Sequence, residues 1–167
     1  MRNLIFFVAC LIFSSPTLAQ HDSKSKKLDG MIKEGIKDWK IPGLAAVIVK
    51  DGEIISKSHN LNREEHNPIR HAEIIAIEKA SSLLKNERLT GCELYVTKEP
   101  CAMCAGAIYW SEIGAIVYGC SAKILGEIAG GRFVVPCREL LANGEREIKV
   151  IGPLLEAEGA EIHRGFW

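Results

Sequence analysis

Apolar residues recur along this chain with two different spacings, which predict two kinds of secondary structure. Residues 28–40 place apolar side chains three or four positions apart, as a helix with one buried face does, and Pro42 would end that helix. The runs 44–50 and 53–58 are short and flank the Asp-Gly dipeptide 51–52, which is typical of a two-residue turn. The first part of the chain therefore predicts a helix followed by an antiparallel hairpin.

The middle of the chain alternates between short apolar runs and longer segments of helical length. The runs 93–97 and 115–119 enclose the segment 102–112, and this order is typical of two parallel strands joined by a crossover helix. A further helix is predicted at 72–84, after a polar segment that contains Asn and Pro. We also expect a loop at 119–131, a last strand at 147–151 and a last helix at 154–162.

These elements make up one α/β domain with five strands. With 167 residues, of which 47% are apolar, the chain can bury a single core and is too short for two. An antiparallel hairpin followed by a parallel crossover gives a mixed sheet with helices packed against it. The sequence contains no internal repeat and no low-complexity linker.

The first residues have the layout of a secretory signal. A basic residue precedes the apolar run 4–13, and the small residues at 17–19 stand before the expected cleavage point. The run is shorter than the roughly 20 apolar residues that cross a bilayer, so we expect no stable membrane anchor. We predict a signal peptide at 1–19, a mature domain at 20–167, and export to the periplasm or the medium. The alternative is a buried N-terminal helix in a cytoplasmic protein.

The charges of the chain are balanced. Its 21 basic and 21 acidic residues give a net charge of zero, so the chain lacks the basic excess that is typical of nucleic-acid binders. A small-molecule partner is therefore expected, with tRNA left open as the alternative. Three histidines are expected to face solvent and not to bind metal: His59, His66 and His163.

The cysteines do not make a regular disulfide framework. Removal of residues 1–19 would take Cys10 away and leave five cysteines, which is an odd number. Cys101 and Cys104 form a Cys-x-x-Cys pair, which occurs in redox pairs, in structural zinc sites and in catalytic metal sites. Spacing alone leaves these three alternatives open. Three other cysteines are expected to be buried as small apolar residues, with a disulfide between two of them as the alternative: Cys92, Cys120 and Cys137.

Two predicted helices begin with side chains that can bind a metal. Residues three apart share a helix face, so Cys101 and Cys104 can bind one ion together, and His71 joins them if both helix starts point at that ion. One imidazole and two thiolates leave the fourth position of a tetrahedral zinc site for water, as in catalytic sites. Glu73 is not needed as a ligand and is therefore free to act as general acid and base.

The His-Ala-Glu motif at 71–73, followed by Pro-Cys-Ala-Met-Cys at 100–104, resembles the signature of the zinc-dependent deaminases. The wider stretch 97–110 is similar to bacterial guanine deaminases and to tRNA adenosine deaminases, and the likeness extends over about 42–119. This resemblance implies the three-layer α/β/α fold of the cytidine deaminases, with a mixed five-stranded sheet. It also implies one Zn²⁺ per chain and a homodimer.

The resemblance also implies roles for individual residues. The implied zinc ligands are His71, Cys101 and Cys104. Glu73 matches the glutamate that shuttles protons, and Asn60 stands where these purine deaminases have an asparagine that bonds the substrate. Ala72 matches the small residue whose backbone amide faces the substrate, and Trp110 is a candidate wall for a flat base. Asn60 and Trp110 each have a structural alternative, as a turn residue and as a core aromatic.

The reaction that the resemblance implies is hydrolytic deamination of an aminated ring, with Glu73 passing a proton to the amine and ammonia leaving. We expect a purine base or nucleoside, guanine first, because 108–110 resembles the guanine deaminases and an exported chain would not meet cytosolic tRNA. A tRNA-specific adenosine deaminase is the alternative, since 105–107 partly resembles those enzymes. A secreted deaminase effector is a second alternative. A binding module with a purely structural zinc is a third, although the sequence has no second pair of ligands to complete such a zinc site.

Overall fold

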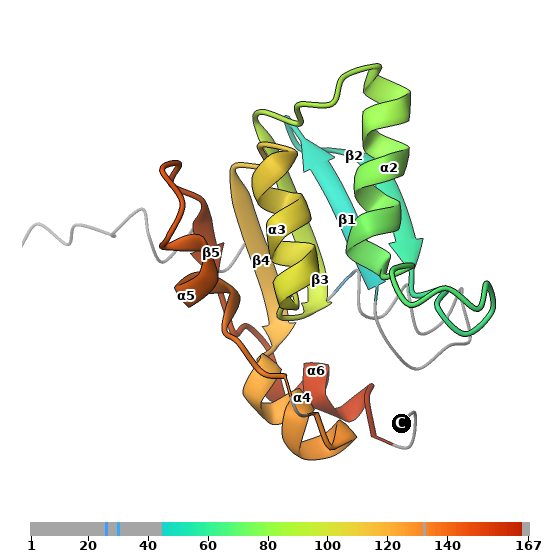
Figure 1. Ribbon diagram of the computed structural model, residues 1–167, viewed down its shortest axis with the longest axis vertical. Coiled ribbons are helices and arrows are strands. Elements are labelled where there is room, and N and C mark those ends of the chain that lie inside the picture. The colour runs from blue at the N-terminus through green and yellow to red at the C-terminus, as the bar shows by residue number, and fades with distance from the viewer. Residues whose placement is uncertain (1–25, 27–29, 31–44, 132, 165–167) are drawn as a thin grey trace, which may run out of the picture.

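The computed structural model describes residues 26, 30, 45–131 and 133–164. The signal peptide predicted at 1–19 lies outside these residues, as does the helix predicted at 28–40 apart from residue 30. Along the described chain (Figure 1) the elements are β1 (Ala45–Lys50), β2 (Glu53–His59), α2 (Ala72–Leu84), β3 (Cys92–Lys98), α3 (Ala102–Trp110), β4 (Ala115–Cys120), α4 (Ala122–Ala129), α5 (Cys137–Leu141), β5 (Lys149–Ile151) and α6 (Glu156–Glu161).

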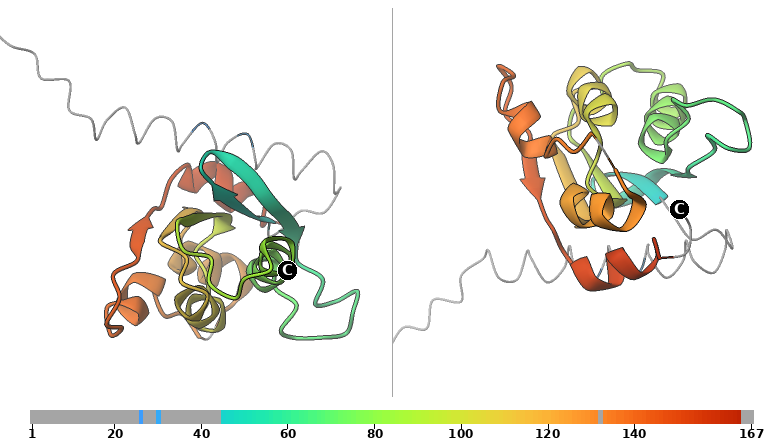
Figure 2. Two further views of the ribbon diagram at one scale, coloured as in Figure 1. Left: turned by 90° about the horizontal axis from the view of Figure 1, so that it is seen from above. Right: turned by 60° about the horizontal axis from the view of Figure 1, so that its bottom comes forward.

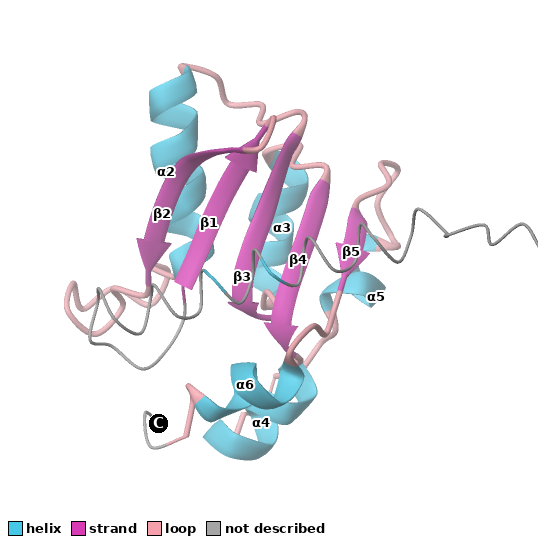
Figure 3. Cartoon of the chain, turned by 180° about the vertical axis from the view of Figure 1, so that it is seen from behind, coloured by secondary structure: helices cyan, strands magenta, loops and turns pink. Residues whose placement is uncertain are grey.

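The strands form one mixed sheet in the order β2-β1-β3-β4-β5 (Figure 3). β1 pairs antiparallel with β2 and β3, whereas β4 is parallel to both β3 and β5. The hairpin turns at Asp51 and Gly52, whose φ values of 49° and 85° are the positive values that a two-residue hairpin turn requires. The predicted hairpin, the crossover through α3 and the mixed five-stranded sheet are therefore confirmed.

Helices flank both faces of the sheet. α2 and α3 lie side by side on one face, and Figure 2 shows α6 on the opposite side of the sheet. The main core, between the sheet and the first two helices, includes Ile48, Leu94, Ile116, Ala76 and Ile108. A smaller cluster on the other face includes Val47, Tyr95, Val117 and Leu154.

Two buried serines of β2 fix the position of α2 on the sheet. The Ser58 hydroxyl donates a hydrogen bond to the carbonyl oxygen of Ala72 at 2.6 Å, and the Ser56 hydroxyl donates one to Ala76 at 2.8 Å. α2 and α3 both begin at the end of the sheet where β3 and β4 terminate (Figure 1). The first residues of the two helices are therefore brought together at one edge of the domain.

Residues 119–131 contain α4 and not the loop predicted there. The Ser121 hydroxyl accepts a hydrogen bond from the backbone N–H of Ile124 at 3.3 Å, and Gly130 ends the helix with a φ of 68°. A serine cap and a C-terminal glycine are helix signals in their own right. The apolar spacing also fails to predict α5, and both β5 and α6 are shorter than predicted. Within the described residues, no helix has the length and apolar character needed to cross a bilayer.

The five described cysteines are all free thiols. Cys92, Cys120 and Cys137 are buried, as predicted, and no disulfide joins them. Burial raises the pKa of Cys120 to about 11 and that of Cys137 to about 12, so both remain thiols at neutral pH.

His163 contradicts the expectation that the histidines outside the motif face solvent. His66 is exposed, but His163, just after α6, is completely buried (0% exposed). Burial, helped by the positive charge of Lys98, lowers the pKa of His163 to about 4. His163 is therefore neutral in the folded protein at pH values where an exposed histidine is charged.

We expect the protein to lose stability as the pH falls from about 6.5 to about 4. In this range the unfolded chain binds a proton at residue 163 that the folded chain does not, so the free energy of unfolding decreases, by roughly 3 kcal/mol in all. Urea unfolding at about pH 7 and about pH 4 gives the free energy of unfolding at each pH, and its decrease between them should be smaller in His163→Gln than in the wild type. The exposed-site control His66→Gln should keep the full loss, and an equal loss in all three proteins would contradict the prediction.

Candidate active site

The three predicted metal ligands meet where α2 and α3 begin. His71 is the N-cap residue of α2, Cys101 is the N-cap residue of α3, and Cys104 lies in the first turn of α3. His71 Nδ1 lies 3.7 Å from Cys101 Sγ and 3.6 Å from Cys104 Sγ, and all three ligand atoms lie within 4.8 Å of one another. Nitrogen and sulfur ligands of a tetrahedral zinc are about 3.6 Å apart, so these side chains fit one zinc ion.

Both helices begin without a side-chain cap. The side chains of His71 and Cys101 make no capping hydrogen bond to the helix that follows each of them. The first N–H groups of a helix have no partner inside the helix, and they carry its partial positive charge toward the metal ligands. The side chain of Ala72 is buried in the core, and its backbone amide belongs to this uncapped first turn of α2. The two helix starts therefore favour the negative charge of two thiolates.

The three ligands also influence each other's protonation. A hydrogen bond from Cys104, with a second contact from His71, lowers the pKa of Cys101 to about 3. The same bond and burial raise the pKa of Cys104, and the contact with Cys101 raises the pKa of His71. Cys101 is therefore the more acidic thiol of the pair, and Cys104 must release its proton when a metal binds.

Glu73 lies two residues after His71 and is completely buried (0% exposed). Neither of its carboxyl oxygens has a hydrogen-bond partner among the described residues, and neither belongs to the cluster of metal-ligating atoms. Burial raises the pKa of Glu73, and the charge of Lys98 partly opposes this. A buried carboxyl group of raised pKa beside a metal site is suited to taking up and releasing protons.

Asn60 lies just past β2, where the following loop returns to His71. The backbone N–H of Leu61 donates a hydrogen bond to the carbonyl oxygen of Arg70 at 3.0 Å, which places Asn60 and His71 at the same end of the loop. Asn60 Nδ2 donates to Asn62 Oδ1 at 2.9 Å, whereas Asn60 Oδ1 is buried and lacks a partner in the described part of the chain. A buried acceptor without a partner costs about 1–3 kcal/mol. Asn60 therefore offers a free acceptor at the position predicted for substrate.

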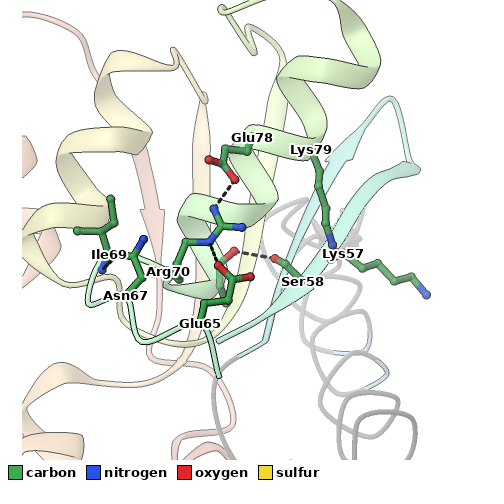
Figure 4. A network of polar contacts seen from close by, with 9 residues as sticks. Lys57, Ser58, Glu65, Asn67, Ile69, Arg70, Glu78 and Lys79 are labelled. Atoms are coloured by element: carbon green, nitrogen blue, oxygen red, sulfur yellow. Dashed lines mark hydrogen bonds and ion pairs between the residues drawn. The ribbon is translucent and has the colours of Figure 1, made fainter. Parts of the chain in front are cut away.

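Arg70 ties this loop to α2 (Figure 4). Its Nε lies 2.7 Å from Glu65 Oε2 in the loop, and its Nη1 lies 2.5 Å from Glu78 Oε2 in the helix. Exposed ion pairs of this kind contribute at most about 1 kcal/mol each. Their effect is geometric, because they attach the loop that carries Asn60 to the helix that carries Glu73.

Trp110 is the last residue of α3 and lies at the opposite end of this helix from Cys101. Six positions along a helix separate Cys104 from Trp110, which corresponds to about 9 Å along the axis. The Trp110 side chain is 82% exposed and contacts Tyr109 edge-on, with ring centroids 5.5 Å apart. Within one chain the structure does not bring Trp110 to the metal ligands, and it does not place it in the core.

Glu99 belongs to this region although the motif analysis does not single it out. It is buried, and its two carboxyl oxygens accept hydrogen bonds from the backbone N–H groups of Ala122 at 2.9 Å and Cys137 at 2.8 Å. Glu99 thereby joins the starts of α4 and α5 to the residues that precede Cys101.

Lys98 is the second residue that the motif analysis does not single out. It is the last residue of β3, and its positive charge acts to lower the pKa of Glu73 and of Cys101. The sequence signal for both residues is the change from the apolar run 93–97 to two charged residues just before the proline of the motif.

Comparison with known proteins places this site in a family. Residues 26–120 match the model of the cytidine and deoxycytidylate deaminase zinc-binding region. The tRNA-specific adenosine deaminase of Aquifex aeolicus is 45% identical over 86 residues, which cover 52% of this chain and 56% of that protein. The tRNA-specific adenosine deaminase of Bacillus subtilis is 40% identical over 116 residues, which cover 61% of this chain and 71% of that protein. A chloroplastic tRNA(adenine(34)) deaminase of Arabidopsis thaliana is 43% identical over 94 residues, 56% of this chain but only 7% of that protein.

Solved structures with the same fold include guanine deaminases and a structure from a study of tRNA deaminases. A structure from a study of tRNA:A34 deaminases is 32% identical, with a TM-score of 0.64, covering 84% of this chain and 99% of that one. The guanine deaminase of Bacillus subtilis is 36% identical, with a TM-score of 0.55, covering 68% of this chain and 71% of that one. The guanine deaminase of Nitrosomonas europaea is 23% identical, with a TM-score of 0.69, and the match covers 97% of this chain and 98% of that one.

The region matched by the family model contains the metal ligands and Glu73, and it ends before α4. The ligand distances fit the zinc that this family binds. The chain therefore belongs to the cytidine and deoxycytidylate deaminase zinc-binding family and is a zinc-dependent nucleobase deaminase, which is a hydrolase.

Proposed function

We propose that this deaminase converts an adenine base carried in RNA, as the tRNA adenosine deaminases do. Its support is the likeness to tRNA-specific adenosine deaminases, which are 45% identical over 86 residues and 40% identical over 116 residues. A structure from the study of tRNA:A34 deaminases supports it further, since this chain covers 99% of it. These comparisons favour the adenosine reading over the guanine substrate that the sequence predicts first.

A free guanine base is the second candidate. The specific observation in its favour is the guanine deaminase of Bacillus subtilis, at 36% identity over 68% of this chain. The predicted signal peptide and the balanced charge also favour a small substrate outside the cytosol. The two candidates share one reaction, in which water replaces a ring amine and ammonia leaves.

Each described residue of the site has a role in that reaction. Zinc, when bound, lowers the pKa of a coordinated water and so supplies the nucleophile at neutral pH. His71, Cys101 and Cys104 would hold this ion. Glu73 takes the proton that the water loses and delivers it to the departing amine, so that its own protonation state is restored after each turnover. Asn60 Oδ1 accepts an N–H of the base and orients it.

The experiment that tests the proposal compares substrates. The zinc-loaded protein would be incubated with adenine, guanine, their nucleosides and an RNA hairpin with an adenosine in the anticodon loop, and ammonia and inosine would be measured. We expect inosine in the hairpin with a kcat/KM at least about 100-fold above that for free guanine, because contacts outside the base contribute to catalysis. Turnover of guanine without turnover of the hairpin would contradict the adenosine reading.

The N-terminus of the native protein gives an independent test of location. Export with cleavage after residue 19 would keep the enzyme away from cytosolic tRNA and would favour the small purine. N-terminal sequencing of the native protein separates the cases, because an exported chain would begin at Gln20. A retained segment 1–19 would favour the RNA substrate.

Substitution of Glu73 tests the proton pathway. Glu73→Gln keeps the size of the side chain and removes the carboxylate, so we expect kcat to fall about 100-fold to 10,000-fold while zinc content and fold are kept. The matched control is Glu158→Gln, at an exposed position of α6, and it should keep wild-type activity. Full activity in a zinc-loaded Glu73→Gln protein would contradict the assigned role.

Zinc binding by the triad is tested by metal content and thermal stability. Cys104→Ala should lower the zinc content from about one per chain to below about 0.1, because two ligands remain. A chelator should lower the Tm of the wild type and leave that of Cys104→Ala unchanged, since bound metal stabilises only the folded state. Cys137→Ala, a buried thiol outside the triad, should retain zinc, and a Cys104→Ala protein with full zinc would contradict the ligand assignment.

A further inference from the structure

Lys98 is a cation beside the active site that the reaction steps above leave without a role. Alternate residues of a strand face the same side, and Cys92, Leu94 and Val96 of β3 face α2 and α3 in the main core. Lys98 continues this row at the end of the strand. Its side chain lines the same cavity as the metal ligand Cys101. Its ammonium group makes no ion pair or hydrogen bond with any described residue.

The cavity lies between the end of β3, helix α4 and the segment 133–135, and its volume is about 270 Å³. Pockets that hold a complete ligand usually measure about 300–1,000 Å³, so this cavity suits one part of a substrate whose base lies at the triad. Apart from Lys98 and Glu99, its walls are largely apolar and include Leu125, Ala129, Phe133 and Val134.

The outer wall of the cavity is packed against α4. The backbone N–H of Gly131 donates a hydrogen bond to the carbonyl oxygen of Gly126 at 3.0 Å. A Cβ atom at position 126 would lie 3.0 Å from Val134 Cγ2, so the glycine allows this close approach. Phe133 is 77% exposed at the rim, where its ring is free to contact a sugar or a neighbouring base.

Glu99 does not neutralise Lys98 by a direct contact. Glu99 is the acidic residue among the described residues that line the cavity. Its two carboxyl oxygens accept hydrogen bonds from the backbone N–H groups of Ala122 and Cys137. The field of Lys98 extends to the catalytic carboxyl, since its charge acts to lower the pKa of Glu73. An anion in this cavity would therefore meet a cation that has no direct partner among the described residues.

We propose that Lys98 and this cavity bind a phosphate group of the substrate, so that the enzyme acts on nucleotides in preference to free bases. This inference rests on the proposed function, because it assumes that the reacting base lies at the metal triad. The sugar would then lie along the apolar wall with Phe133, and the phosphate would reach the ammonium group, which binds phosphate as a point charge. The phosphate comes either from a mononucleotide or from the RNA backbone beside the reacting nucleotide.

The test compares substrates with and without a phosphate. kcat/KM would be measured for adenosine, AMP and an RNA hairpin with the wild type, Lys98→Gln, Lys98→Arg and Lys123→Gln. Lys123 is an exposed residue of α4 that does not line the cavity, so it is the matched control. The kcat/KM for AMP divided by that for adenosine should fall about 10-fold to 100-fold in Lys98→Gln, because a charged contact to phosphate is lost. Lys98→Arg should keep most of the ratio, and Lys123→Gln should change it less than about 2-fold.

Binding measurements separate this site from the reaction itself. AMP binding would be measured by calorimetry with Glu73→Gln and with Glu73→Gln/Lys98→Gln. Without Lys98 the Kd for AMP should rise at least about 10-fold. The number of ions released on binding, taken from the slope of log K against log salt concentration, should decrease by about one. A Lys98-dependent affinity for AMP in a protein that deaminates no base would overturn the proposed function alone. An equal loss for adenosine and AMP, or no loss for adenosine, AMP and the hairpin alike, would overturn the phosphate site. A loss confined to the hairpin identifies the phosphate as that of RNA, and a loss that includes AMP identifies a mononucleotide site.

Discussion

The zinc site depends on the distance between the first residues of α2 and α3. Here the histidine nitrogen of α2 lies 3.7 Å from Cys101 Sγ and 3.6 Å from Cys104 Sγ of α3. The sheet sets the distance, because β3 runs directly into the turn before α3, and buried serine hydroxyls of β2 hold the carbonyl oxygens of α2. The core between them consists largely of small and branched side chains, which allow both helices to lie close to the strands.

The same arrangement explains how Glu73 is tolerated in the core. A fully buried carboxyl group without a hydrogen bond destabilises a fold, and such groups are kept where a function requires them. Two uncapped helix starts and the charge of Lys98 bring positive potential to this region, so the cost of ionising Glu73 is smaller than burial alone would make it. The raised pKa of Glu73 and the opposing charge of Lys98 suit this carboxyl group to accepting and donating a proton.

The sequence predicts the metal ligands well because each one lies at a helix start that can be recognised locally, from the motif and from the apolar spacing that follows. Other features depend on distant parts of the chain. The burial of His163 results from its packing after α6, and the cavity beside Lys98 needs α4, whose signals are a serine cap and a glycine end instead of an apolar run. Trp110 shows the converse case, because resemblance identifies its position in the sequence while helix geometry carries it about 9 Å from Cys104.

The end of β3 combines several functions in four consecutive residues. Lys98 faces the cavity, Glu99 anchors α4 and α5, and Cys101 binds the metal. The metal ligands and Glu73, to which the proposed chemistry is assigned, are held by α2, α3 and the sheet. The cavity walls opposite Lys98, Glu99 and Cys101 come from α4 and from 133–135, which lie outside the region that matches the family model. The proposed phosphate site therefore depends on the second half of the domain, and Glu99, two positions before Cys101, connects that half to the half that holds the metal ligands through its hydrogen bonds to Ala122 and Cys137.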